Sequence, residues 1–402
     1  MENEKKQLIN ILKDSLNNSK YKNIECNNWN EIFQEAIEHD LSSLVYYTLD
    51  KSILNKMDEG LLNDWKKDVF FSNVHQIKTI NEIYEVISDL VELGVEIICL
   101  KGLVLRDYYP KAELRTMNDG DILVHKEDFS KVSEYLLNRG YKCKGEINNL
   151  HEVFYSENTN NIIEVHWKLV NENYTFKNTK EFEENLWTNS IAKKINGVNV
   201  RVLSSEDSII HLCFHMAVHA RYSGFGLRQI FDLAVFIENE KIDWFLLMKR
   251  AEQFGITRFL DGMLVLLNKY FDVVVPRIII EDTNIKKEEV EIFINFAYLC
   301  GNNGKKNEIE DFKYLARNGI AKKKECSNFL KVARFIIPTK TKLKHTYKGA
   351  DKFTILLPFY AIHYIFKKGV INKYGIVQCA KNISESLAIG NNRRKFLITF
   401  DI

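Results

Sequence analysis

The sequence predicts an α+β fold in which a small mixed β-sheet is flanked by helices. Short aliphatic runs separated by turn-like residues occupy residues 95–203, which is typical of strands. Apolar residues recur at helical spacing in residues 1–94 and again from residue 204 onwards. We therefore expect a helical N-terminal part, an α/β core at 95–203, a helical part at 204–304 that closes a cleft, and a basic helical part at 305–402.

The composition is that of a globular, helix-rich chain. Hydrophobic residues make up 46% of the 402 residues, and only 4 residues are proline and 18 glycine. The seven cysteines form no C-x-x-C pair, so free thiols in a reducing cytosol explain them better than disulfides or a zinc site. The N-terminus lacks a signal-peptide layout, and the longest apolar stretch, residues 353–366, is shorter than the ~20 residues of a membrane span. We expect a cytoplasmic protein without a transmembrane segment.

The N-terminal part carries no catalytic signature. Apolar residues from Trp29 to Ile37 repeat at helical spacing, and a longer helix carries Phe70, Ile77 and Ile87 on one stripe before Gly94 ends it. We interpret this part as a helical support for the sheet or as one half of a substrate cleft.

The first strand of the core, residues 95–100, leads directly into Lys101 and Gly102. An amphipathic helix is expected from Leu103 to Tyr109. A glycine at such a junction allows close approach of the backbone, and the free N–H groups and dipole of the new helix favour a phosphate. Lys101 and Gly102 are therefore candidates for binding a nucleotide phosphate.

Asp119 and Asp121 stand at the start of the next aliphatic run. Residues i and i+2 of a strand project from the same face, so the two carboxylates would lie side by side with Gly120 turned away. Paired carboxylates are ligands for a divalent metal ion, although a D-x-D pattern alone also occurs as a solvated pair. The glycine is expected to weaken this strand.

A third carboxylate follows on a later strand. After a helix over 126–139 and two short strands, the polar cluster 158–161 predicts a turn into a strand with Glu164 and His166 on one face. Pairing across that turn would bring Glu164 back beside the aspartates. A phosphate loop, paired aspartates and a further carboxylate together indicate metal-dependent nucleotidyl transfer. Asn196-Gly197 predicts one more hairpin.

These motifs resemble those of the uncharacterised bacterial nucleotidyltransferase family within the polymerase-beta-like superfamily. The resemblance rests on Leu100-Lys101-Gly102, Arg115-x-x-x-Asp119-x-Asp121, Glu164-x-His166-Trp167, the run 205–215 and Leu227-Arg228-x-x-x-Asp232. It implies a small mixed sheet of polymerase-beta type. Two departures stand out: Lys101-Gly102-Leu103 offers no hydroxyl where the superfamily has a glycine-serine pair, and Gly120 replaces an aliphatic residue.

The resemblance implies a role for each residue of these motifs. Asp119 and Asp121 would hold two Mg²⁺ ions, and Glu164 would complete the nucleophile-side ion or accept a proton; magnesium suits an all-oxygen ligand set. Lys101, Gly102, Arg115, His166 and Arg228 are the nucleotide-binding candidates. His166 is equally explained as a core histidine bonded to backbone, and Arg228 with Asp232 as an intrahelical ion pair.

The helical part begins at a capping box, Ser204 to Asp207, and further helices are expected near 225–238, 243–254, 256–271 and 287–300. Its first helix presents His211, His215 and His219 at spacings of four residues, hence on one face. Because no carboxylate or cysteine follows at metal-motif spacing, zinc is not favoured. We expect His215 or His219 to line the acceptor side of the cleft.

The charge of the chain is unevenly distributed. Residues 305–402 carry 21 Lys and Arg against 7 Asp and Glu, or +14, while the rest of the chain carries −12. Such a tail would attract an anionic partner, although a solvated basic face is the usual explanation. Its aromatic residues fit a buried helix better than an RNA-stacking surface.

The sequence therefore predicts transfer of a nucleoside monophosphate from an NTP to an unidentified acceptor, with release of pyrophosphate. One alternative is a catalytically silent nucleotide-binding or scaffold protein, which the presence of all three carboxylates argues against. The other is an RNA-directed nucleotide-adding enzyme, suggested by the basic tail but not favoured. The sequence does not distinguish a small-molecule acceptor from a macromolecule.

Overall fold

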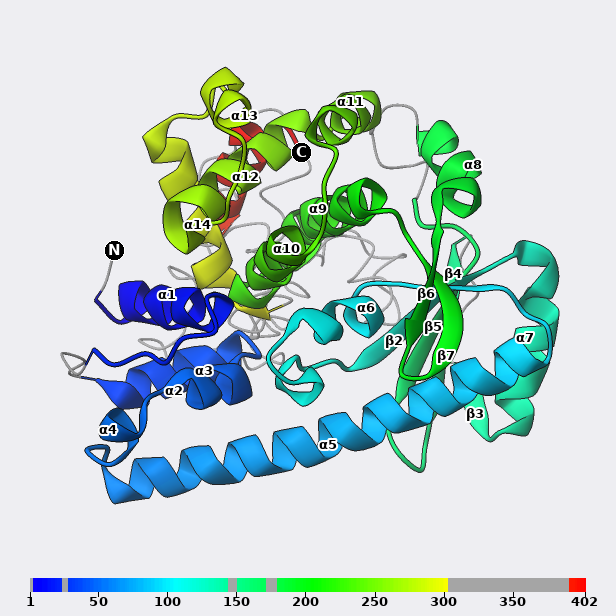
Figure 1. Cartoon of the computed structure of the whole chain (residues 1–402), viewed down its shortest axis with the longest axis horizontal. Helices are drawn as coiled ribbons and strands as arrows, with labels where there is room; N and C mark the ends of the chain where they lie inside the picture. The colour runs from blue at the N-terminus through cyan, green and yellow to red at the C-terminus, as the bar shows by residue number, and fades with distance from the viewer. Residues whose placement is uncertain (1–2, 24–27, 144–149, 171–178, 303–389) are drawn as a thin grey trace, which may run out of the picture. The chain divides into compact units, whose positions relative to one another are not determined.

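The computed structural model describes residues 3–23, 28–143, 150–170, 179–302 and 390–402 (Figure 1). They fall into two compact units, one of residues up to 216 with 227–290, the other of 217–226, 291–302 and 390–402. The predicted basic part is described only at 390–402, and the apolar stretch 353–366 lies outside the described residues. The part boundaries at 94, 203 and 304 stay predictions.

The chain before the sheet is helical, as predicted. It forms α1 (Asn3–Leu16), α2 (Trp29–Glu38), α3 (Ser42–Thr48), α4 (Lys51–Leu54) and α5 (Glu59–Glu92). Side-chain caps start three of these helices, since Asn28 accepts from Glu31 N, Asp50 from Ser52 N and Asp58 from Leu61 N. Each cap satisfies a backbone donor that the first turn leaves unpaired.

Helix α5 runs from the N-terminal helices to the sheet (Figure 1). Its N-terminal half carries Trp65, which is buried and donates to Ser42 O, and its C-terminal half buries Ile83 and Ile87 in the core of the sheet. Between these ends Phe70 and Phe71 remain exposed. The predicted stripe is therefore buried only where α5 reaches the sheet.

The described residues form one mixed seven-stranded sheet in the order β3-β4-β5-β2-β1-β7-β6. The strands are β1 (Ile97–Cys99), β2 (Asp119–Val124), β3 (Tyr141–Cys143), β4 (His151–Ser156), β5 (Ile162–His166), β6 (Ile191–Ile195) and β7 (Val198–Val202). β2 pairs with β5, and β1 with β7, in parallel; the other neighbours are antiparallel. Both predicted hairpins are present, and Asn196 and Gly197 turn the second with φ of 47° and 86°.

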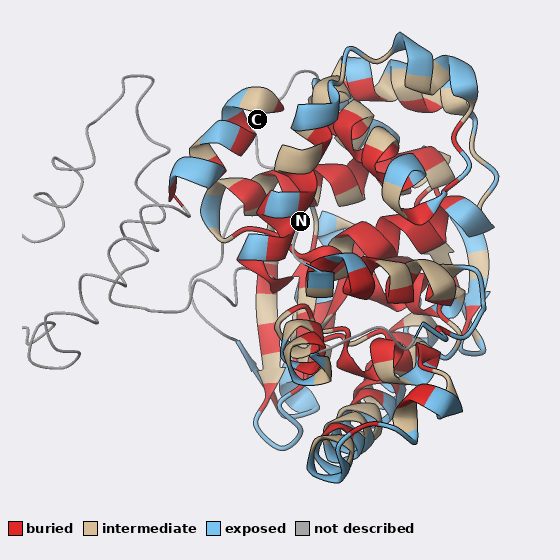
Figure 2. Ribbon diagram, turned by 90° about the vertical axis from the view of Figure 1, so that its left-hand side faces the viewer, coloured by how far each residue is buried: buried red, intermediate tan, exposed pale blue. Residues whose placement is uncertain are grey.

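One face of the sheet forms the hydrophobic core with α5 and α7. Ile122, Val124, Phe154 and Val165 are fully buried there, and Figure 2 shows buried residues running through the packed elements. Gly120 lies on this face, where a Cβ would meet Ile83 Cγ2 at 2.9 Å. β2 runs unbroken through Gly120, and the bare backbone there lets α5 pack closely, so the glycine has a packing role that the sequence did not show; a weakening of the strand stays a prediction.

The other elements of the described residues are helices. The elements are α6 (Gly102–Leu105), η1 (Arg106–Tyr108), η2 (Ala112–Leu114), η3 (Lys126–Asp128), α7 (Phe129–Asn138), α8 (Thr179–Asn189), α9 (Ser205–Tyr222), α10 (Leu227–Asn239), α11 (Trp244–Phe254), α12 (Thr257–Phe271), α13 (Arg277–Asp282) and α14 (Lys287–Cys300). The four helices predicted after residue 225 match α10, α11, α12 and α14. Within the described residues, none of these helices has the length and apolarity of a membrane span.

Candidate functional site

Parallel pairing of β2 with β5 places three carboxylates on one face of the sheet. Asp121 is in register with Glu164, and Asp119, two residues earlier on β2, is in register with Ile162. Paired residues of neighbouring strands project to the same side, so the carboxylates of both strands face away from the hydrophobic core. The hairpin to β4 turns β5 back, but it is the β2 neighbour that brings Glu164 to the aspartates.

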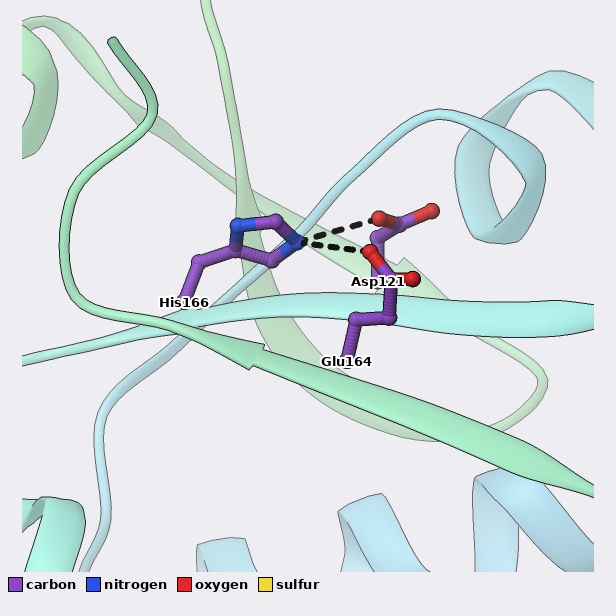
Figure 3. A group of neighbouring side chains, drawn as sticks. All are labelled: Asp121, Glu164 and His166. Atoms are coloured by element: carbon purple, nitrogen blue, oxygen red, sulfur yellow. Dashed lines mark hydrogen bonds and ion pairs between the residues drawn. The ribbon is translucent and has the colours of Figure 1, made fainter. Parts of the chain in front are cut away.

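His166 lies between two of these carboxylates (Figure 3). Its Nε2 is 3.1 Å from Asp121 Oδ1 and 3.5 Å from Glu164 Oε2. The alternative of a core histidine bonded to backbone is therefore wrong. The ring is buried, as the core interpretation required, but its partners are the carboxylates of the site.

The side chain of Lys101, which follows β1, contacts the carboxylate of Asp121. Its Nζ donates to Asp121 Oδ1 at 2.8 Å. β1 is antiparallel to β2, and Leu100 N donates to Asp121 O, so the residue after the strand stands beside Asp121. The Lys101 backbone has φ of 43° and ψ of −117°, a conformation that costs a non-glycine residue of order 1–3 kcal/mol.

The two aspartates have opposite protonation behaviour. Burial, reinforced by Asp121, raises the pKa of Asp119 to about 6. Burial would also raise the pKa of Asp121, but Lys101 and His166 outweigh it and hold that pKa well below its usual range. Two equivalent-looking carboxylates thus separate into one that is readily protonated and one that stays ionised.

The cations show the complementary effect. Burial opposes the charge of Lys101, but Asp121, Glu164 and Asp119 together raise its pKa. Burial likewise opposes the charge of His166, and its bonds to Asp121 and Glu164 raise its pKa. Lys101 thus supplies positive charge next to Asp121, and the same carboxylate favours the protonated form of His166.

Gly102 is constrained by its neighbours. A Cβ on Gly102 would lie 2.4 Å from Arg115 Nη1 and 2.7 Å from Met117 Sδ. The helix that follows, α6, has four residues rather than the predicted seven and gives way to the turn η1 before Pro110. Gly102 is thus required for packing, and a phosphate role for Lys101 and Gly102 stays a prediction.

Arg115 forms an ion pair with Asp232 of α10, which lies far away in the sequence. Its Nη2 and Nε lie 2.9 Å and 3.2 Å from the two carboxylate oxygens of Asp232 on α10, and Tyr109 donates to Asp232 Oδ1 at 2.8 Å. The predicted Arg228–Asp232 ion pair is wrong, because Asp232 faces inward and bonds Arg115 instead. This buried ion pair occupies Nε and Nη2 of Arg115, and binding of a nucleotide by Arg115 stays a prediction.

Arg228 faces the start of β2 from one turn earlier on α10. Its Nη1 donates to Thr116 O at 3.0 Å and lies 3.5 Å from Asp40 Oδ2. Its positive charge acts to lower the pKa of Asp119. Among the described residues, Arg228 Nε is buried without a hydrogen-bond partner. Binding of the triphosphate by Arg228 stays a prediction.

The histidines of α9 differ in their surroundings. His211 is buried, and burial together with the charge of Lys101 lowers its pKa to about 3, so it is neutral. His215 lies one turn further on, with ring centroids 6.4 Å apart. His219 belongs to the second unit, where its Nδ1 is 2.9 Å from Ser223 Oγ. The acceptor-side role of His215 and His219 stays a prediction.

His151 was missed by the sequence interpretation. It is opposite His166 in the β4–β5 register, and the two rings lie 4.7 Å apart at an angle of 42°. The signal was only partial, because extending the predicted hairpin outward from the turn at 158–161 places residue 151 across from residue 168, whereas the structure pairs Tyr155 with Ile162 and so places it across from residue 166. Asp40, Tyr109 and Asp232 had no such signal, since their partners are distant in sequence.

The mixed sheet, with its carboxylates on the parallel pair β2 and β5, gives the class of protein: the chain is a nucleotidyltransferase. Residues 25–272 match the family described as "Uncharacterised nucleotidyltransferase", and the chain belongs to that family. The resemblance to an uncharacterised nucleotidyltransferase family is confirmed, as is the α+β fold, while the bacterial origin stays a prediction. A search of curated proteins returned no match.

Three solved structures match the chain. The lincomycin-bound lincosamide antibiotic adenylyltransferase LnuA has 15% identity and a TM-score of 0.29, over 39% of this chain and 94% of that one. The antibiotic-resistance factor ANT(2'')-Ia has 11% identity and a TM-score of 0.32, over 49% and 98%. A nucleotidyltransferase-like protein from Paracoccidioides brasiliensis has 13% identity and a TM-score of 0.32, over 49% and 94%. Likenesses of this size carry no argument about the substrate.

Proposed function

We propose that the protein transfers a nucleoside monophosphate from an NTP to an acceptor hydroxyl and releases pyrophosphate. The observation that carries the proposal is the parallel register in which Asp121 faces Glu164 with Asp119 on the same face. In this reaction the acceptor oxygen bonds to the α-phosphorus, the bond to the bridging oxygen of pyrophosphate breaks, and the acceptor proton passes to a base.

The residues at the site fit divalent cations. Asp119, Asp121 and Glu164 offer hard oxygen donors from two adjacent strands. Asp121 stays ionised because Lys101 and His166 lower its pKa. Asp119 and Asp121 would hold two Mg²⁺ ions, with Glu164 on the acceptor side. Such ions would neutralise the charge of the triphosphate and make the acceptor hydroxyl more acidic.

The chain's own side chains would bind the nucleotide and move the proton. Glu164 is the candidate base, because its side chain is 23% exposed and therefore accessible to an acceptor. Lys101 is the first candidate for the phosphates: its ammonium already lies at the carboxylates and sits on a flexible stem. Arg228 is the second, since its Nε is unpartnered among the described residues.

Incubation with each α-labelled NTP and Mg²⁺, with and without a metabolite extract, tests this proposal. We expect label on an acceptor and stoichiometric pyrophosphate with at least one NTP, and loss of both in Glu164→Gln. Tight NTP binding without label transfer in any extract would instead support the silent nucleotide-binding alternative. Label on RNA alone would support the RNA-directed alternative.

A further inference from the structure

Three potential ligand atoms of the site form a compact triangle. One atom from each of Asp121, Glu164 and His166 lies within 4.8 Å of the other two. With bonds of about 2.1 Å to a metal ion, two ligands are about 3.0 Å apart at a right angle and about 3.4 Å apart at a tetrahedral angle. The two distances from His166 Nε2, 3.1 Å and 3.5 Å, have the length of these edges, and Nε2 would release its proton when a cation binds.

The imidazole is held rigidly in this position. His166 lies in β5 between two strands, in register with Leu123 of β2 and His151 of β4. Its side chain is only 9% exposed, and Nε2 points between the two carboxylates (Figure 3). A ligand fixed on a central strand loses little conformational freedom when it binds a cation.

The flexible side chain of Lys101 already places a positive charge beside Asp121. Asp121 Oδ1 accepts from Lys101 Nζ as well as lying next to His166 Nε2. Lysine carries its charge on a flexible stem, so the ammonium can leave when a cation or a phosphate arrives. Lys101 therefore competes with a divalent cation for Asp121, and its removal should favour the cation.

From this geometry we infer that Asp121, Glu164 and His166 together form a three-ligand cation centre with one nitrogen donor. This goes beyond the all-oxygen Mg²⁺ site and rests on the proposed function, of which it would be the acceptor-side centre. Carboxylate and water ligands suit Mg²⁺ and Mn²⁺ alike, whereas an imidazole nitrogen favours a first-row transition ion over Mg²⁺. The centre binds Mn²⁺ in preference to Mg²⁺, and His166 supplies that preference.

Pulsed electron paramagnetic resonance of Mn²⁺ bound to the full chain, without nucleotide, tests the ligand directly. We expect ¹⁴N modulation from a coordinated imidazole, and its replacement by the ¹⁵N pattern when the histidines are ¹⁵N-labelled. His166→Gln should lose the signal. His151→Gln, which alters the neighbouring ring 4.7 Å away, should keep it. Mn²⁺ that binds stoichiometrically without nitrogen coupling in the labelled wild type overturns the inference, and this readout needs no substitution.

Competition between the two ions tests the preference. We expect His166→Gln to lose Mn²⁺ affinity by about tenfold or more while Mg²⁺ affinity changes much less, because the amide oxygen remains a hard ligand. Lys101→Gln should bind Mn²⁺ more tightly than wild type. Equal losses for the two ions in His166→Gln would overturn the inference. NMP transfer with Mg²⁺ but no nitrogen coupling would support the proposed function and overturn the nitrogen-ligand inference. Nitrogen coupling without any transfer would support the nitrogen ligand and contradict the proposed function.

Discussion

At the scale of single residues, the two aspartates of β2 contribute oppositely to stability when no cation is bound. Asp119 has a raised pKa in the folded protein, so its ionisation destabilises the fold. This destabilisation is complete above about pH 6 and vanishes below about pH 4. Asp121 has a depressed pKa, so its ionised form stabilises the fold above about pH 4, and this contribution is lost as the pH falls below that. Ionised Asp119 therefore lowers the stability of the fold, whereas ionised Asp121 raises it.

Asn substitutions at the two positions should separate them. In EDTA at neutral pH, Asp119→Asn should melt at or above wild type, a gain of up to about 3 kcal/mol that largely disappears near pH 4. Asp121→Asn should melt well below wild type, because it leaves buried Lys101 and His166 without their carboxylate. Thermal melts of both variants from pH 4 to 8 provide the measurement. Stabilisation by Asp121→Asn would show that Lys101 does not neutralise this carboxylate.

Lys101 gives a prediction in kinetics. If its ammonium binds phosphates in both the ground state and the transition state, Lys101→Ala should raise the KM for NTP more than it lowers kcat. Steady-state rates at varied NTP, with Lys111→Ala as a control outside the site, provide the measurement. An unchanged apparent NTP affinity in Lys101→Ala would leave Lys101 with only its role beside Asp121.

At the scale of elements, the sequence predicted what local patterns encode. The helical period predicted α5, α10, α11, α12 and α14, and the strand runs predicted the shared face of Asp119 and Asp121 and that of Glu164 and His166, because each depends only on neighbouring residues. Contacts between distant residues left no local pattern. The Arg115–Asp232 pair joins residues 117 apart, and Gly120 is explained only by the packing of Ile83 against it.

The contact between α5 and β2 can be tested at Gly120. Gly120→Ala should destabilise the protein by about 1–3 kcal/mol, because its methyl would overlap Ile83 at 2.9 Å in a close-packed core. Ile83→Ala alone should cost about 2–5 kcal/mol through the cavity it leaves. The double variant should lose less than the sum of the two in urea unfolding, since the new methyl fills part of that cavity. Additive losses would rule out direct packing of the two residues.

The ion pair between Arg115 and Asp232 links the segment before β2 to α10. Asp232→Asn should cost about 3–5 kcal/mol, because Arg115 would remain buried with its charge uncompensated. Arg115→Met combined with Asp232→Leu should recover much of that loss. A double-mutant cycle by urea unfolding measures the coupling, with Arg277→Met and Glu281→Leu as an exposed control pair that should show almost none. Similar coupling in both cycles would contradict the structural role of the buried pair.

At the scale of the whole molecule, ligand binding should appear as a gain in stability. A ligand that binds only the folded state adds about 2.7 kcal/mol at a free concentration of 100 times its Kd. Wild type with Mg²⁺ and the preferred NTP should therefore melt higher than wild type in EDTA, and the shift should grow with NTP concentration. Asp121→Asn should show little of this gain, because Asp121 lies at the centre of the site and bonds both Lys101 and His166. Gly120→Ala, which changes the opposite face of the same strand, is the matched control and should keep the full shift despite its lower starting temperature. A full ligand shift in Asp121→Asn, with none lost relative to the control, would place the nucleotide site elsewhere in the chain.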